Sequence, residues 1–151
     1  MKTVAFTSLD AEDQALLREA VERLPHSLNK VSNPQTSVVA VTDKGSHYGN
    51  NIFLSNCTLF CAEAVSLASS VAAGDSDIKK LYLAVGRADK KPDVISPCGN
   101  CRQMLHDFAH LHGHPIQIFS TTNDLEEVMI TNSDELLPEG FKSASLGKMA
   151  K

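Results

Sequence analysis

Two short stretches carry the strongest pattern in this sequence: Cys61-Ala62-Glu63 and Ser96-Pro97-Cys98-Gly99-Asn100-Cys101-Arg102-Gln103. Each lies where the surrounding residues predict the start of a helix. A helix N-terminus has free backbone N–H groups and a partial positive charge, and both stabilise a thiolate over a thiol. Two adjacent helix starts can therefore bring the thiolates of Cys61, Cys98 and Cys101 to one zinc ion. Three protein ligands leave the fourth tetrahedral position for water, which is the arrangement of a catalytic zinc site.

Glu63 lies two residues after Cys61, in the first turn of the predicted helix. A carboxylate at this place can point into the zinc site without being a ligand. Zinc lowers the pKa of bound water to ~7, and a neighbouring carboxylate can take the water proton and pass it to a substrate nitrogen. The residues therefore predict one Zn²⁺ per chain and Glu63 as the catalytic acid–base group.

The cysteines allow two other interpretations. A Cys98–Cys101 pair between a strand and a helix is also typical of a thioredoxin-like redox site, although that leaves the Cys61 motif unexplained. Cys57 stands four residues before Cys61 and could complete a structural zinc site with four ligands. We expect Cys57 instead to be a small buried residue. A zinc-binding or redox module without hydrolase activity is thus the alternative to an enzyme.

Hydrophobic periodicity and turn residues predict that helices and strands alternate along the chain. The predicted helices span residues 11–24, 61–73, 99–111 and 133–137. The predicted strands span residues 36–42, 46–53, 80–86, 115–120 and 127–130. Such an alternation indicates an α/β fold in which helices cover the faces of a layered sheet.

Length and charge narrow the class of protein. The 151 residues are close to the ~150 of a typical domain, so we expect one domain, with a core over about 10–141 and a frayed tail over 142–151. The formal net charge is −4 and no basic stripe is present. Binding to a nucleic-acid polymer normally needs such a stripe, so a small-molecule partner is favoured. The absence of a long apolar run predicts a cytoplasmic protein without membrane contact.

Four histidines lie in or just after the predicted helix 99–111, namely His106, His110, His112 and His114. Histidines near a helix C-terminus interact favourably with its last carbonyl groups. We therefore expect these side chains on the surface, in preference to a second metal site.

Together, the two Cys motifs resemble the signature of the cytidine deaminase superfamily of zinc deaminases. They are most similar to the small free-standing branch that includes cytidine deaminases and blasticidin S deaminase. That branch has three Cys ligands, and its Ser-Pro-Cys-Gly-x-Cys-Arg-Gln motif is close to residues 96–103. Residues 135–141 also resemble the end of that branch, and the whole resemblance covers roughly residues 10–141. It implies a three-layer α/β/α fold with a mixed five-stranded sheet and helices on both faces.

The resemblance also implies a function. The expected enzyme is a zinc-dependent hydrolytic deaminase that converts the exocyclic amine of a cytosine nucleoside, cytidine or deoxycytidine, to a carbonyl and releases ammonia in pyrimidine salvage. A blasticidin S-type aminonucleoside deaminase is the alternative within the family. The implied substrate pocket is lined by Asn51, Phe53, Ala62 and Phe141. The implied assembly is a homotetramer or a homodimer.

The sequence departs from the family pattern in the implied substrate pocket. Gly49-Asn50-Asn51-Ile52-Phe53 stands at the place of the family's Gly-x-Asn-x-Glu segment, whose Asn and Glu contact the sugar. Aligning the glycines puts Asn51 on the family Asn and Phe53 on its Glu, whereas counting back from Cys61 selects the residue before each. Under either alignment the Glu is absent, and blasticidin S deaminase has an aromatic residue there. Ala64 also stands where cytidine deaminases usually have Arg.

Overall fold

The computed structural model describes residues 1–29, 34–55, 58–87 and 91–142. Its central sheet has six strands, which are from one edge to the other β1 (Lys2–Ala5), β9 (Glu127–Asn132), β8 (Gln117–Thr122), β7 (Lys80–Gly86), β3 (Gln35–Val41) and β4 (Ser46–Asn50). A smaller sheet, called the mini-sheet below, consists of β2 (Leu28–Asn29), β5 (Ile52–Ser55) and β6 (Thr58–Phe60).

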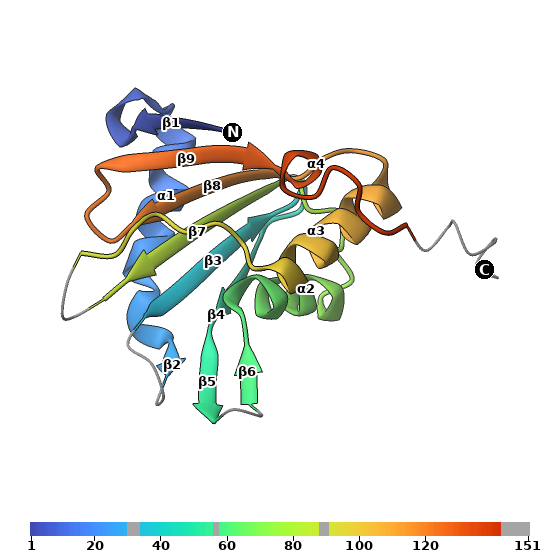
Figure 1. The fold of residues 1–151 in the computed structure, drawn as a ribbon, viewed down its shortest axis with the longest axis horizontal. Helices are drawn as coiled ribbons and strands as arrows, with labels where there is room; N and C mark the ends of the chain where they lie inside the picture. The colour runs from blue at the N-terminus through green and yellow to red at the C-terminus, as the bar shows by residue number, and fades with distance from the viewer. Residues whose placement is uncertain (30–33, 56–57, 88–90, 143–151) are drawn as a thin grey trace.

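Helices cover both faces of the central sheet (Figure 1). Helix α1 (Ala11–Glu22) lies on one face, and α2 (Ala62–Ala72) and α3 (Gly99–His112) lie on the other. The short helix α4 (Ser133–Leu136) follows β9 and contacts α3. The predicted three-layer α/β/α fold is therefore confirmed.

The helix boundaries follow from local capping. The Asp10 carboxylate accepts a 2.8 Å hydrogen bond from the backbone N–H of Asp13 and so caps α1. Cys61 and Cys98 occupy the N-cap positions of α2 and α3, with extended backbone angles. Helix α3 ends at Gly113, whose φ of 76° lies in the left-handed region that glycine adopts without strain. The cysteines of both motifs are thus placed at helix starts, as the sequence predicts.

The sheet topology brings those two helix starts to the same edge. Strands β7 and β8 form the parallel pair of the central sheet, and α3 connects them. Helix α2 leads into β7 through residues 73–79, and α3 leads into β8 through residues 113–116. Because these connections are short, the N-terminus of each helix lies toward the carboxyl ends of the parallel strands, where α/β proteins commonly bind their ligands.

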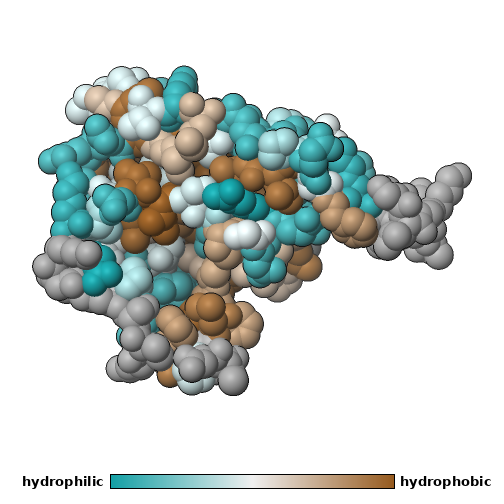
Figure 2. Space-filling view, in the orientation of Figure 1, coloured by the Kyte–Doolittle hydropathy of each residue, from teal (hydrophilic) through white to brown (hydrophobic). Residues whose placement is uncertain are grey.

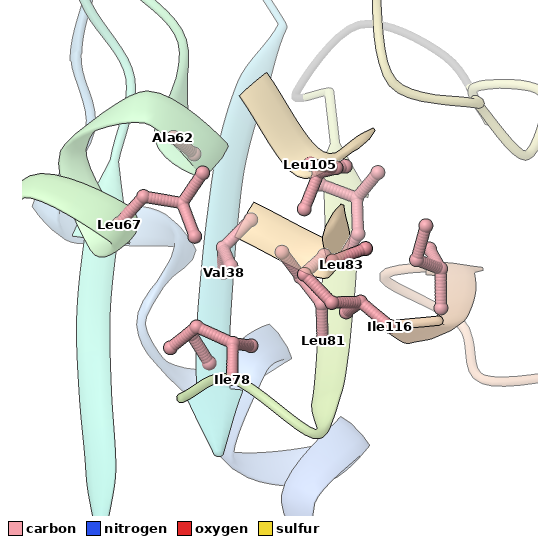
Figure 3. Packing of buried hydrophobic residues seen from close by; sticks show 11 residues of the cluster. Val38, Ala62, Leu67, Ile78, Leu81, Leu83, Leu105 and Ile116 are labelled. Carbon is pink, nitrogen blue, oxygen red and sulfur yellow. The ribbon is translucent and has the colours of Figure 1, made fainter. Parts of the chain in front are cut away.

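Two apolar clusters hold the layers together. Buried side chains between the sheet and helices α2 and α3 form one cluster (Figure 3). Along the strands these side chains alternate with the buried side chains that face α1. The cluster under α2 and α3 comprises Val38, Ala40, Ala62, Leu67, Ile78, Leu81, Leu83, Leu105, Ala109, Ile116 and Ile118. The cluster under α1 comprises Phe6, Leu17, Ala20, Leu24, Val39, Tyr82, Ala84, Phe119 and Val128. Both faces of β3 and β7 are therefore buried, which explains the apolar runs Val38–Val41 and Leu81–Val85.

The sheet differs from the sequence prediction in its strand count. The five predicted strands become six because residues 2–5, which were not assigned to a strand, pair antiparallel with β9. The predicted second strand is divided at Asn51, so that β4 stays in the central sheet and β5 enters the mini-sheet. The expected loop at 26–35 contributes the short strand β2, which pairs parallel with β5. Helix α1 ends two residues early, and Pro25 lies in the 3₁₀ helix η2 (Leu24–His26).

Two further sequence predictions touch residues that are not described. Cys57 lies outside the described residues, and so does all of the expected frayed tail except Lys142. Within the described part of the chain, none of the helices combines the length and the apolar character that crossing a bilayer requires.

Candidate zinc and catalytic site

The sulfur atoms of Cys61, Cys98 and Cys101 come together at the starts of α2 and α3. All three lie within 4.8 Å of one another, and Cys61 Sγ is 3.7 Å from Cys98 Sγ. Zinc–sulfur bonds of ~2.3 Å at tetrahedral angles place two sulfurs ~3.8 Å apart. The spacing of the thiols therefore fits a tetrahedral zinc ion held by three cysteines.

The charges of the site also fit a cation. Burial, then the Glu63 charge, raises the pKa of the Cys61 thiol to about 11. Burial and the same carboxylate raise the pKa of the Cys101 thiol still further. The pKa of Cys98 is held below its usual value, because the backbone N–H of Cys101 and the adjacent thiols outweigh the opposing effect of burial. Three thiols and one carboxylate disfavour each other's ionisation, and a divalent cation among them removes that cost.

Glu63 is the buried carboxylate of this cluster. Its side chain is only 4% exposed, at the first turn of α2. Burial raises the pKa of Glu63, while a hydrogen bond from the Cys101 thiol opposes that shift. A carboxylate with a raised pKa beside a metal site is suited to accepting and returning a proton near neutral pH.

Arg102, which the sequence analysis treated only as part of the motif, holds the loop ahead of Cys98. Its Nε donates a 2.8 Å hydrogen bond to the carbonyl of Pro97, and a terminal nitrogen donates to Ser96 Oγ at 3.1 Å. The guanidinium therefore fixes the two residues before the exposed thiol. The sequence could have indicated this role, because residues four apart on a helix are neighbours and Arg102 follows Cys98 by four residues.

Gly49 explains how β4 can lie against the start of α2. A Cβ atom on Gly49 would stand 2.1 Å from the carbonyl oxygen of Ala62 and 2.4 Å from the backbone nitrogen of Ser66. The absence of a side chain thus permits direct backbone contact between the strand and the helix that carries Glu63. This close approach positions residues 50–53 beside the candidate site.

The structure distinguishes the two asparagines that the sequence left as alternatives. Successive residues of a strand face opposite sides, and Gly49 faces α2. Asn50 therefore faces α1, where its Nδ2 donates a 2.8 Å hydrogen bond to the carbonyl of Arg23. Asn51 comes next, and its amide bonds to the start of β3 and the residue ahead of it: Oδ1 accepts from Thr36 N–H at 2.9 Å and Nδ2 donates to the Pro34 carbonyl at 3.2 Å.

The other expected pocket residues come from three separate elements. Ala62 is fully buried at the first position of α2. Phe53 is half-buried in β5, the central strand of the mini-sheet. Phe141 is exposed, but its carbonyl accepts a 2.9 Å hydrogen bond from Nε2 of Gln103, two residues after Cys101. The fold thus brings the C-terminal segment back to the helix that carries two of the thiols.

The mini-sheet carries an apolar surface, which Figure 2 shows at the end of the molecule where β5 and β6 project. Its exposed large side chains are Leu28, Leu54, Leu59 and Phe60. Phe60 is 54% exposed and directly precedes Cys61. This apolar surface therefore begins next to the thiol cluster.

The expected surface position does not hold for all of the histidines on α3. His110 is exposed, whereas His106 is only 6% exposed and lies under Gly140, where a Cβ would be 2.9 Å from the imidazole ring. The expectation of a surface position is therefore wrong for His106. It failed because the C-terminal segment folds back over α3, which helical periodicity does not reveal.

The fold and the site together define a class: an α/β/α protein in which two converging helix starts bring together a buried carboxylate and three thiols spaced to hold a metal ion. Residues 10–111 match the family model described as the cytidine and deoxycytidylate deaminase zinc-binding region. The chain thus belongs to the cytidine deaminase family of zinc-binding deaminases, which are hydrolases that act on carbon–nitrogen bonds.

Individual relatives agree with this assignment. A cytidine deaminase of Mycoplasma genitalium is 31% identical over 114 residues, which are 75% of this chain and 82% of that protein. A blasticidin-S deaminase of Bacillus cereus is 37% identical over 53 residues, which are 32% of this chain and 38% of that protein. The crystal structure of cytidine deaminase from Burkholderia pseudomallei is similar in fold, with a TM-score of 0.71 and 24% identity over 88% of this chain and 100% of that one.

Proposed function

We propose that this protein hydrolyses the exocyclic amine of a cytosine nucleoside, cytidine or deoxycytidine, and releases ammonia. The observation that carries the proposal is the buried Glu63 carboxylate beside three converging thiols. The similarity to cytidine deaminases supports the choice of substrate. Ligands Cys61, Cys98 and Cys101 hold one Zn²⁺ per chain, and Asn51, Phe53, Ala62 and Phe141 line the pocket.

The residues of the chain divide the chemistry between them. Zinc, when bound, lowers the pKa of water and so supplies a nucleophile at neutral pH. Glu63 accepts a proton from water and delivers it to the ring nitrogen. It then carries a second proton, from the hydroxyl group added to the ring carbon, to the departing amine, which leaves as ammonia. Burial of Glu63 excludes bulk water from this transfer, and its place two residues after Cys61 in the first turn of α2 holds the carboxylate beside the thiol cluster.

The direct test is ammonia release by zinc-loaded protein from cytidine, deoxycytidine, cytosine and blasticidin S. Replacing Glu63 by Gln keeps the size of the side chain and removes the proton acceptor. We expect retained zinc and a fall of about 10²–10⁴-fold in kcat. Glu12→Gln is the matched control, because Glu12 is an exposed carboxylate on α1, on the opposite face of the sheet.

The same assay separates the alternatives. Near-normal turnover by Glu63→Gln would remove this residue from the mechanism. Blasticidin S as the only accepted compound would favour the aminonucleoside deaminase suggested by the shorter match. Disulfide reductase activity without ammonia release would instead identify a redox module.

We further propose that residues 1–151 form one deaminase domain that assembles as a homotetramer or homodimer in the cytoplasm and serves pyrimidine salvage. The exposed apolar side chains of the mini-sheet support an assembly, because monomers rarely expose contiguous apolar surface of this kind. Light scattering measures the mass directly. A monomeric mass at micromolar concentration would contradict the assembly, and Phe60→Ser is expected to weaken it.

A further inference from the structure

The segment after α4, residues 137–142, is tied to α3 at two places one helical turn apart, and Figure 1 shows it beside that helix. Gln103 donates a 2.9 Å hydrogen bond from Nε2 to the carbonyl of Phe141. Three residues further along α3, the imidazole ring of His106 lies under Gly140. Residues three apart on a helix share one face. The segment therefore lies along the helix that carries two of the three thiols.

Gly140 meets the ring of His106 face on. A Cβ atom on Gly140 would stand 2.9 Å from each of the ring atoms Cγ, Cδ2 and Nε2. A point at one distance from three atoms of a planar ring lies on the axis of that ring, so residue 140 passes over the face of the imidazole. Real Cβ atoms keep at least 3.0 Å from their neighbours. Glycine therefore lets the segment lie this close to α3 while His106 keeps its place.

His106 has little room to move aside, because the fold encloses its side chain. The residue is only 6% exposed, and neither ring nitrogen has a hydrogen-bond partner among the described residues. Burying a polar group without a partner costs stability, so hydrogen bonding does not explain a histidine at this position. What the ring provides is a flat surface on which residue 140 lies. The side chain of His106 thus sets the height at which the segment crosses α3.

We propose that His106 and Gly140 form a size-matched pair that places Phe141 for substrate binding, which makes His106 a positioning residue. Phe141 follows Gly140 directly, and Gln103 fixes its carbonyl, so the height of the segment over α3 determines where the phenyl ring lies. The inference rests on the proposed function, in which Phe141 lines the pocket. It adds that two side chains of α3 act on the substrate through that residue.

The size match is tested by breaking it and then restoring it. Gly140→Ala adds a methyl group that collides with the ring, and His106→Ala in the same protein removes the ring. We expect Gly140→Ala to raise KM for cytidine about tenfold with kcat within about twofold, because one aromatic contact contributes about that factor to binding in both the ground state and the transition state. The double variant should return KM to within about threefold of wild type. Glu139→Ala is the matched control, because its exposed side chain is next to Gly140.

Binding measurements separate positioning from a purely structural role. Calorimetry of zinc-loaded Glu63→Gln protein gives the Kd of cytidine with and without Gly140→Ala, and we expect the same rise of about tenfold. A pair that only stabilises the fold would lower Tm and leave Kd and KM unchanged, and that result overturns the inference. A double variant that binds cytidine as weakly as Gly140→Ala overturns it as well.

A second variant removes the other tie between the segment and α3. Gln103→Met keeps the length of the side chain and loses the donor to the Phe141 carbonyl, so Kd should rise here too; an unchanged Kd would count against the inference. Asp107→Ala, which removes the other hydrogen-bond partner of that amide, is the control. Ammonia release by the wild-type protein is measured in parallel. The expected Kd values without any ammonia release would overturn the proposed function alone, and failure to bind cytidine at all would overturn both.

Discussion

Replacing Gly49 by Ala tests the contact that joins strand β4 to helix α2. The added Cβ would stand 2.1 Å from the Ala62 carbonyl oxygen, whereas real Cβ atoms keep at least 3.0 Å, so strand and helix must separate by ~0.9 Å. The opposing atoms belong to the backbone and cannot rotate away. We therefore expect the upper part of the usual overpacking range, about 3 kcal/mol. For a chain of this size that corresponds to a fall in Tm of about 6–12 °C.

The same displacement moves Glu63 relative to the thiols of α3, so the zinc content and kcat of Gly49→Ala should fall as well. A misplacement of about 1 Å can reduce catalysis by about 10². Gly99→Ala is the matched control, because a Cβ there meets no atom within 4 Å although Gly99 adjoins Cys98. Its stability should stay within about 0.5 kcal/mol of wild type. Denaturant unfolding, metal analysis and ammonia release measure the three effects. A Gly49→Ala protein as stable and active as Gly99→Ala would refute the reasoning.

Two further predictions concern the metal and the response to acid. Cys101→Ala should lose zinc and unfold at lower denaturant concentration, because metal binding contributes to folding; a full zinc complement by metal analysis would contradict this. Hydrogen bonds from Lys79, then His114, lower the pKa of Asp77 from 3.8 to about 2. The stability that ionised Asp77 contributes is present above pH 4 and is lost as the pH falls toward 2, so Asp77→Asn should be less stable than wild type at pH 6 and equal to it near pH 2. Asp43→Asn, at an 83% exposed side chain, is the control, and an Asp77→Asn deficit that persists at pH 2 would count against the assignment.

The sequence by itself determined the features that depend on neighbours along the chain. Helix ends are set by residues close together in the chain. Local capping rules therefore predict that both Cys motifs stand at helix starts, with Glu63 in the first turn of α2, and that α3 ends before Gly113. The long apolar runs of β3 and β7 likewise indicate strands buried on both faces. These local rules were sufficient to predict an α/β fold with helices on the faces of a sheet, and the helix starts that carry the thiols.

The tertiary structure alone decided what depends on residues distant in sequence. Strand β1 exists because β9 offers it an edge, and its four residues have too little periodicity to predict it. The placement of Asn50 on the α1 face of the sheet required the direction of β4 relative to α2, which the backbone contact at Gly49 establishes. His106 became buried through a segment more than thirty residues later. In each case the energy comes from pairing or burial between separate elements, and such contacts form only when the whole chain has folded.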